Sequence, residues 1–312
     1  MLGILLILSF SKCEKTTNNS NPRVNLDSLN PDNYPTVDGS TSAHPLQVLI
    51  ACEILDVEYS WIPSIFDETH RIWPSFDKKP DIAQFIVDSI VHNGTHSSYE
   101  NLILGKDDLI IVARTASDDE LHLADSIGIA LTTTPIALDA FVFIANDNNP
   151  VNGLSVEEIQ DIYTGKIKNW QEVGGNNAEI HPYQRNPNSG SQELMESLVM
   201  KNLTMLDFPE MIVFGMMGLI NQVSHDWDGL GYTVYFFQQF MAPNDDLKLL
   251  AVNDILPSYN SLREGDYIYT TEVFAVIRED LDKASTAMLL YNWFITPEGQ
   301  EVISKSGYIP YH

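Results

Sequence analysis

Short apolar runs rich in β-branched residues alternate along this chain with longer amphipathic segments. The runs are too short for helices and indicate buried strands, of which the clearest are residues 108–113, 139–146 and 273–277. Between them lie helical patterns such as residues 155–164, where Ser155 and Glu158 form a capping box. Strands that alternate with helices predict an α/β fold with mainly parallel sheets. No other property of the chain restricts its fold as strongly.

The remaining elements extend the same pattern. We expect further strands at residues 34–37, 180–183 and 231–237, the last of which could run into a helix. We expect further helices at residues 42–55, 80–92 and, as the last element, 285–296. A chain of 312 residues exceeds the usual size of a single small core, so two domains are predicted.

The chain is strongly acidic, with 17 Lys and Arg against 43 Asp and Glu and a formal net charge of -26. Nucleic-acid-binding proteins need a basic surface, so no nucleic-acid partner is expected. Broad docking on anionic lipid is disfavoured for the same reason. An anionic ligand is not excluded, because surface charges are screened over about 8 Å at physiological salt and donors inside a cleft are not.

The first ten residues are apolar except for Ser9. This run is shorter than the roughly 20 residues of a spanning helix and fits the apolar part of a secretory signal. With Cys13 behind it and a polar stretch following, it resembles a bacterial lipoprotein signal. The resemblance implies a signal peptide at 1–12, a lipid on Cys13 and a flexible tether over 13–33. The protein would then lie in the periplasm or on the outer face of the cell membrane, held only by its lipid. A cleaved leader with a free thiol is the alternative.

The second cysteine, Cys52, lies in an apolar helical pattern and is expected to be a buried thiol, so no disulfide is predicted. His92 and His96 have a metal-like spacing, but Gly94 intervenes and no further ligand cluster is visible. No metal and no cofactor are expected.

Residues 185–193 join one cation, two hydroxyls and a glycine to the start of a helical pattern. A helix start offers unpaired N–H groups and a partial positive charge. The fork of Arg185 matches two oxygens at once, and Gly190 allows close approach of the backbone. The segment therefore suits a small oxyanion, although Ser189 and Gln192 could equally form an ordinary helix cap.

Two other helix starts are rich in hydroxyls. One follows the expected first strand and contains Ser40, Thr41 and Ser42. The other, residues 93–100, contains Thr95, Ser97 and Ser98. In α/β sheets, ligands bind beside helix starts at the carboxyl ends of strands. Three such starts and Arg185 would form a donor shell for a tetrahedral oxyanion; three independent caps are the alternative.

The chain resembles, over nearly all of its mature length, the phosphate-binding proteins that deliver phosphate to ABC-type importers. The resemblance is carried by residues 38–42, 135–142, 154–159, 163–170, 173–175, 228–232, 299–300 and 307–310, and by the 185–191 loop. It implies a two-lobed periplasmic-binding-protein-like fold of type II, with the ligand cleft between two α/β domains. The first lobe would comprise residues 34–139 and 270–312, and the second residues 140–269.

The resemblance also implies roles for particular residues. Arg185 would clamp phosphate oxygens, and further donors would be Ser189, Gly190 and Ser191 from one lobe and Ser40, Thr41, Ser42 and one of Thr95, Ser97 and Ser98 from the other. Some members place an acid in the segment that corresponds to residues 113–118. Arg114 sits near the expected position of that acid and could be a second cationic ligand or a surface residue.

The function implied is a non-enzymatic receptor, expected to be monomeric, that binds inorganic phosphate outside the cytoplasmic membrane and delivers it to the permease subunits of an ABC importer. Alternatives are a receptor or sensor for another tetrahedral oxyanion, such as sulfate or molybdate, and a hydrolase with Ser189 as nucleophile, which would need a nearby base.

Overall fold

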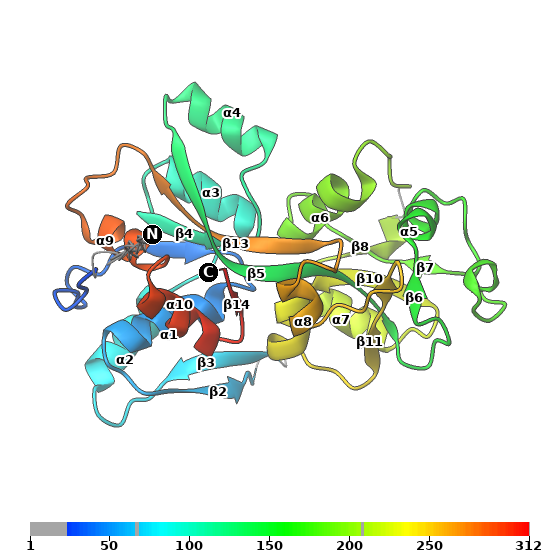
Figure 1. Ribbon diagram of the computed structural model, residues 1–312, viewed down its shortest axis with the longest axis horizontal. Coiled ribbons are helices and arrows are strands. Elements are labelled where there is room, and N and C mark those ends of the chain that lie inside the picture. The colour runs from blue at the N-terminus through cyan, green and yellow to red at the C-terminus, as the bar shows by residue number, and fades with distance from the viewer. Residues whose placement is uncertain (1–23, 66–68, 207–208, 312) are drawn as a thin grey trace, which may run out of the picture.

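The computed structural model describes residues 24–65, 69–206 and 209–311. The expected signal peptide, Cys13 and the first part of the expected tether lie outside the described residues. The chain forms two lobes side by side, each with strands flanked by helices (Figure 1). The predicted α/β class and two-lobed architecture are confirmed.

The first lobe contains elements from both ends of the chain. Its elements are β1 (Val37–Gly39), α1 (His44–Ile54), β2 (Tyr59–Pro63), β3 (His70–Pro74), α2 (Pro80–Ser89), α3 (Thr95–Ile103), β4 (Leu109–Val112), α4 (Asp118–Ser126), α9 (Thr286–Trp293), α10 (Pro297–Lys305) and β14 (Ile309–Pro310).

The second lobe is built from the middle of the chain. Its elements are β6 (Gly153–Leu154), α5 (Val156–Tyr163), β7 (His181–Pro182), β8 (Gln184–Arg185), α6 (Gly190–Leu194), β9 (Ile212–Val213), α7 (Met216–Ser224), β10 (Gly229–Val234), β11 (Leu247–Leu249), β12 (Ala251–Val252) and α8 (Tyr259–Arg263). Four further helical segments add to these, at Trp170–Val173, Met195–Met200, Pro209–Met211 and Phe237–Met241.

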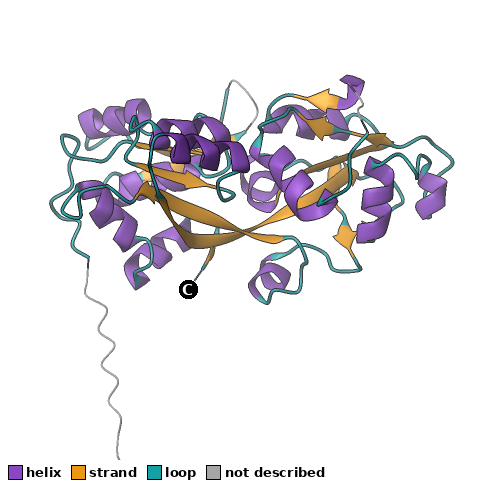
Figure 2. Ribbon diagram, turned by 90° about the horizontal axis from the view of Figure 1, so that it is seen from above, coloured by secondary structure: helices purple, strands orange, loops and turns teal. Residues whose placement is uncertain are grey.

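Two long strands, β5 (Leu131–Asn146) and β13 (Thr270–Arg278), run between the lobes (Figure 2). Up to Ala140, β5 pairs with β13. From Phe141 onward it pairs with β10, and its last residues also pair with β11. The partner of β5 therefore changes within one strand, and the same strand contributes to the core of both lobes.

The prediction of mainly parallel sheets is wrong. The main sheet has the order β1-β4-β13-β5-β10-β7. Along this order, β1–β4 and β10–β7 are parallel, whereas β4–β13, β13–β5 and β5–β10 are antiparallel. The reason is that β13 and β10 both run opposite to β5, the strand that passes between the lobes. Crossing strands of this kind cannot be recognised from the hydrophobicity of each run alone.

The helix at residues 285–296 was expected to be the last element, and this was wrong. It ends at Trp293, and Thr296 begins α10, where its hydroxyl accepts the N–H of Gly299 at 3.1 Å. The capping box of Ser155 and Glu158 at the start of α5 is confirmed.

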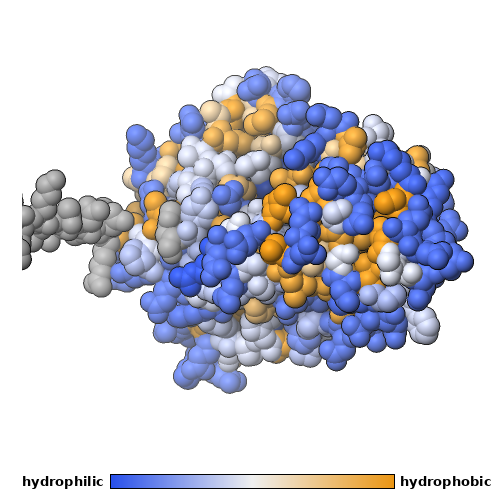
Figure 3. Space-filling view, turned by 45° about the vertical axis from the view of Figure 1, so that its right-hand side comes forward, coloured by the Kyte–Doolittle hydropathy of each residue, from blue (hydrophilic) through white to orange (hydrophobic). Residues whose placement is uncertain are grey.

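One continuous hydrophobic cluster extends through both lobes and includes Cys52, which is a free, fully buried thiol. Leu29 is also buried, and the backbone N–H of Tyr34 donates to the carbonyl of Asn30 at 2.9 Å. The last part of the expected tether is therefore part of the folded body. Hydrophilic residues cover most of the face shown in Figure 3. Within the described ranges, no helix has the length and apolar character needed to cross a membrane.

Candidate functional site

The predicted oxyanion loops surround one cavity of about 430 Å³ between the lobes. The first lobe contributes the segment before α1, the start of α3 and the end of β4; the second lobe contributes the start of α6, the loop after β8 and the start of α7. The lining residues are Ser40, Thr41, Ser42, Asn93, Gly94, Thr95, His96, Ser97, Ala113, Arg185, Asn186, Pro187, Asn188, Ser189, Gly190, Ser191, Leu194, Phe214, Gly215, Met216 and Val234.

The segment before α1 is held as a tight turn. The N–H of Ser40 donates to the carbonyl of Ile111 at 3.0 Å, and the N–H of Ala43 donates to the carbonyl of Ser40 at 3.0 Å. The backbone N–H groups of Thr41 and Ser42 have no acceptor among the described residues. These two amides are therefore available to a ligand in the cavity.

Asp38, which the sequence did not single out, fastens the second loop to the first. Its fully buried carboxylate accepts from the N–H of Gly39 at 2.7 Å, from the backbone of Asn93 at 2.8 Å and from the side-chain amide of Asn93 at 2.9 Å. A buried carboxylate with this many donors is satisfied and does not need a ligand. Asp38 thus positions the start of α3 rather than contacting the cavity.

Three hydroxyls of α3 were candidates, and the structure separates them. Thr95 and Ser97 line the cavity. Ser98 does not line it: its hydroxyl is buried and lies 3.0 Å from the carbonyl of Gly39 and 2.8 Å from that of Gly94. Because its hydrogen is shared between these two acceptors, Ser98 locks the loop in place.

The start of α6 serves both as a cap and as part of the cavity wall. The hydroxyl oxygen of Ser189 accepts the N–H of Gln192 at 3.2 Å, as in an ordinary cap. The side chain of Gln192 does not complete a capping box, because its oxygen accepts the backbone N–H of Arg185 at 3.2 Å. Gly190 and Ser191 line the cavity in the first helical turn, where backbone N–H groups lack intrahelical acceptors.

Arg185 is a buried cation that has no counter-charge among the described residues. It is 7% exposed, and its Nε donates to the carbonyl of Val213 at 3.1 Å. Across the described part of the chain, no carboxylate forms an ion pair with it. Burial lowers the pKa of Arg185 below its usual value, since desolvation disfavours the charged form. A buried cation that lacks a carboxylate partner would be stabilised by an anion that binds from outside the protein.

The structure places Arg114 neither in the cavity lining nor at the surface. Its guanidinium donates to both oxygens of Glu120 at 2.8 Å, and both side chains are buried. It also donates to the carbonyl of Thr115 at 2.9 Å and does not line the cavity. Oε1 of Glu120 also lies 3.0 Å from Nδ1 of His96, and His96 does line the cavity.

The sequence missed a fourth helix start. Phe214, Gly215 and Met216 bring the beginning of α7 to the cavity, and Gly215 has a φ of 72°. Gly215 is followed by two methionines and by no hydroxyl, so the sequence contains no sign of a polar site at this helix start. The described lining contains no Asp or Glu, and no group of His, Cys, Asp and Glu in the described ranges could hold a metal ion.

Two lobes joined by crossing strands, with a donor-lined cavity between them, define a solute-binding protein of the periplasmic type. The family model described as the PBP superfamily domain matches residues 69–298, and the chain belongs to that superfamily.

Named relatives agree with this family. The chain is 24% identical over 225 residues to the phosphate-binding protein PstS of Staphylococcus epidermidis, covering 69% of this chain and 67% of the relative. It is 23% identical over 236 residues to protein SphX of Synechococcus elongatus, covering 70% and 67%.

Solved structures show the same fold. A putative phosphate ABC transporter substrate-binding protein from Clostridium perfringens, solved with bound phosphate, is 23% identical with a TM-score of 0.65, covering 90% of this chain and 100% of its own. An ABC-type phosphate transport receptor from Vibrio cholerae is 20% identical with a TM-score of 0.61, covering 88% and 99%.

Proposed function

We propose that this protein binds inorganic phosphate in the cavity between its lobes and delivers it to the permease subunits of an ABC importer. The observation that carries the proposal is the buried guanidinium of Arg185, which has no carboxylate partner among the described residues and lines a cavity with unpaired backbone donors. The names of the relatives support phosphate as the ligand.

The donor set suits a tetrahedral anion. Ser40, Thr41, Ser42 and Thr95 approach it from the first lobe, and Arg185, Ser189, Gly190 and Ser191 from the second. Each hydrogen bond to a charged group contributes about 1.5–3 kcal/mol. A ligand held from both sides favours the closed arrangement of the lobes, since only that arrangement completes its contacts.

The cavity offers little to distinguish phosphate from other oxyanions. A carboxylate would accept the proton of hydrogen phosphate and repel fully ionised sulfate, but the described lining contains none. Neutral acceptors such as the side-chain carbonyls of Asn93, Asn186 and Asn188 remain. Sulfate and molybdate are therefore the alternatives to test beside phosphate.

The wider assignment is also a proposal. We infer a secreted, monomeric receptor anchored by lipid on Cys13, with a first lobe of residues 34–139 and 270–312 and a second of residues 140–269. The change of partner along β5 between Ala140 and Phe141 supports this division. We infer no catalysis, because the hydroxyl of Ser189 acts as a helix cap and the histidine of the cavity, His96, is engaged by Glu120.

Calorimetry on the mature chain tests the proposal. The protein is first denatured, dialysed to remove bound anions and refolded. Phosphate, sulfate and molybdate are titrated separately. We expect one phosphate per chain, and about a 100-fold or greater loss in Arg185→Ala, which removes two charge-assisted hydrogen bonds. Arg278→Ala is the control, because that arginine pairs with Asp280 at the surface, outside the cavity. No binding of phosphate by the refolded wild type would overturn the proposal.

A further inference from the structure

Tyr308 lies in the 307–310 segment near the C-terminus, which has no part in the cavity lining. The side chain is 2% exposed, and its hydroxyl donates to the carbonyl of Ser42 at 3.0 Å. Ser42 belongs to the cavity turn before α1, 266 residues away in the sequence. The buried hydroxyl of Tyr308 therefore forms a hydrogen bond with the backbone of a segment that lines the cavity.

This hydrogen bond acts on one peptide unit of the turn. The carbonyl of the Ser42–Ala43 peptide accepts from Tyr308, and its N–H donates to the carbonyl of Ser40 at 3.0 Å. With both ends held, this peptide cannot rotate without breaking a buried hydrogen bond. The adjoining N–H groups of Thr41 and Ser42, which have no acceptor among the described residues, are held in place with it.

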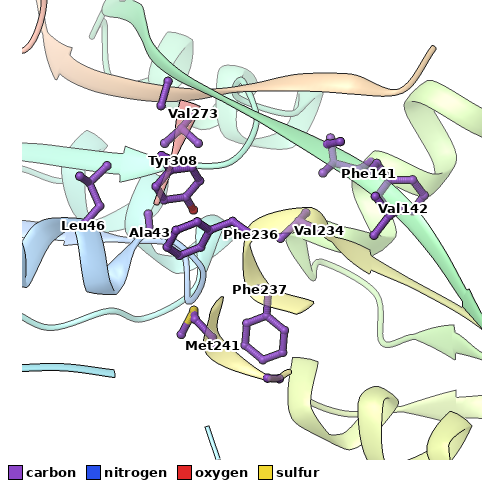
Figure 4. Packing of buried hydrophobic residues seen from close by; sticks show 14 of the residues in the cluster. Ala43, Leu46, Phe141, Val142, Val234, Phe236, Phe237, Met241, Val273 and Tyr308 are labelled. Carbon is purple, nitrogen blue, oxygen red and sulfur yellow. The ribbon is translucent and has the colours of Figure 1, made fainter. Parts of the chain in front are cut away.

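The ring of Tyr308 connects this turn to the second lobe. It stacks on the ring of Phe236, with centroids 3.7 Å apart and planes within 6°. Figure 4 shows the two side chains next to each other. Phe236 follows β10, and its N–H donates to the carboxylate of Asp139 in β5 at 2.9 Å. At Gly307, where φ is 100°, a Cβ would lie 2.8 Å from the ring of Phe240, so the backbone there must be glycine for Tyr308 to reach this position.

We propose that Tyr308 is a positioning residue for anion binding, which orients the backbone donors of Thr41 and Ser42 and links their position to the second lobe through Phe236. The inference rests on the proposed function for its ligand, but the restraint on the turn exists in the protein without ligand. It acts through the hydroxyl, and the stack on Phe236 aligns that hydroxyl with Ser42.

The test compares Tyr308→Phe with a matched control, Tyr267→Phe. Both tyrosines are buried, and each hydroxyl donates to a buried carbonyl; that of Tyr267 contacts Phe141 at 3.1 Å, away from the cavity. Both variants keep the ring and lose one hydrogen bond, so their thermal midpoints should fall by similar amounts. For Tyr308→Phe alone we expect roughly 3- to 10-fold weaker phosphate binding by calorimetry, the effect of one net hydrogen bond.

Amide hydrogen exchange supplies a second, ligand-free readout. In Tyr308→Phe, exchange over residues 41–44 should accelerate relative to wild type and to Tyr267→Phe, while the rest of α1 stays protected. Phe236→Leu, which removes the stack but keeps the hydroxyl, should accelerate the same amides.

The outcomes are distinguishable. Unchanged exchange at residues 41–44 in Tyr308→Phe would overturn the positioning role, as would equal losses of phosphate affinity in the two Tyr→Phe variants. Failure of the wild type to bind phosphate would overturn the proposed function, and the exchange result would still decide whether Tyr308 restrains the turn.

Discussion

Gly190 of the second lobe lies so close to Thr95 of the first that a Cβ at position 190 would be 2.8 Å from Oγ1 of Thr95. The two residues begin α6 and α3, and both line the cavity. The lobes therefore meet at this point, and a methyl group at position 190 would force the Thr95 hydroxyl to move. We therefore expect closure of the cavity to depend on the absence of a side chain at position 190.

We expect Gly190→Ala to weaken phosphate binding about 10-fold or more, because the added methyl prevents the lobes from approaching. The φ of Gly190 is not in the left-handed region, so the helix itself accepts alanine. Calorimetry gives the affinity, and a thermal midpoint without phosphate that stays at or above the wild-type value separates a closure defect from a folding defect.

The double variant Gly190→Ala, Thr95→Ala tests whether this contact is the cause. Removal of the Thr95 hydroxyl leaves only its Cβ, 3.5 Å from the added methyl, which is an ordinary contact. In the Thr95→Ala background, Gly190→Ala should therefore cost little further affinity. Additive losses would show that the methyl group acts somewhere other than at Thr95.

Arg185→Met should stabilise the ligand-free protein while it abolishes phosphate binding. The buried guanidinium has no carboxylate partner in the described part of the chain, so an apolar side chain of similar length removes an uncompensated charge. We expect a gain of roughly 1 to 2 kcal/mol in the free energy of unfolding without phosphate.

Saturating phosphate should reverse this order of stability. Phosphate at 100 times its Kd stabilises the wild type by about 2.7 kcal/mol and leaves the variant unchanged. Urea unfolding with and without phosphate measures both values. A ligand-free variant that is less stable than the wild type would mean that the guanidinium already has sufficient partners inside the protein.

Arg114→Met should have the opposite effect on stability. Loss of the Arg114 guanidinium leaves the buried carboxylate of Glu120 without its bidentate partner. Removal of one member of a buried ion pair lowers the free energy of unfolding by about 3–5 kcal/mol. Arg278→Met is the matched surface control, and it should change stability far less because solvent screens its pair with Asp280. Equal effects of the two substitutions in urea unfolding would contradict this account of Arg114.

The sequence was sufficient for the parts of the site that depend on local patterns. A hydroxyl or glycine at a helix start can be recognised within a few residues, which is why Thr41, Thr95 and Ser191 were predicted and all line the cavity. Their role as ligands stays a prediction. Local patterns could not show which of Thr95 and Ser98 lines the cavity. The hydroxyl of Ser98 donates to the carbonyl of Gly39, which lies 59 residues earlier in the chain.

Features that depend on distant contacts escaped prediction. Arg114 is a candidate ligand in the sequence because it sits near the position of an acid in some family members. Its pairing with the buried Glu120 could not be inferred from spacing alone. The antiparallel pairing of β13 with β5 joins residues more than 120 positions apart, so the strand pattern did not reveal it. Gly215 at the start of α7 had no polar neighbour to mark it.

Asp139 gives a last prediction, on the pH dependence of folding. It lies in β5 beside the change of strand partner and is 2% exposed. Its Oδ1 accepts the N–H groups of Ala140 at 2.8 Å and Phe236 at 2.9 Å, but its Oδ2 has no partner within the described residues. Burial raises the pKa of Asp139 to about 7, and the nearby Tyr235 and Tyr308 are neutral at that pH.

The sign of the effect follows from linkage. Between its unfolded pKa, about 3.9, and its folded pKa, the unfolded chain loses the proton of Asp139 while the folded chain retains it, so stability should fall as pH rises from about 4 to 7 and level off above. Asp139→Asn keeps the Oδ1 acceptor and cannot ionise, so this component should vanish. Urea unfolding of both proteins from pH 4 to pH 8 measures the difference. If the difference in the free energy of unfolding between wild type and variant is constant over this range, Asp139 is ionised in the folded state.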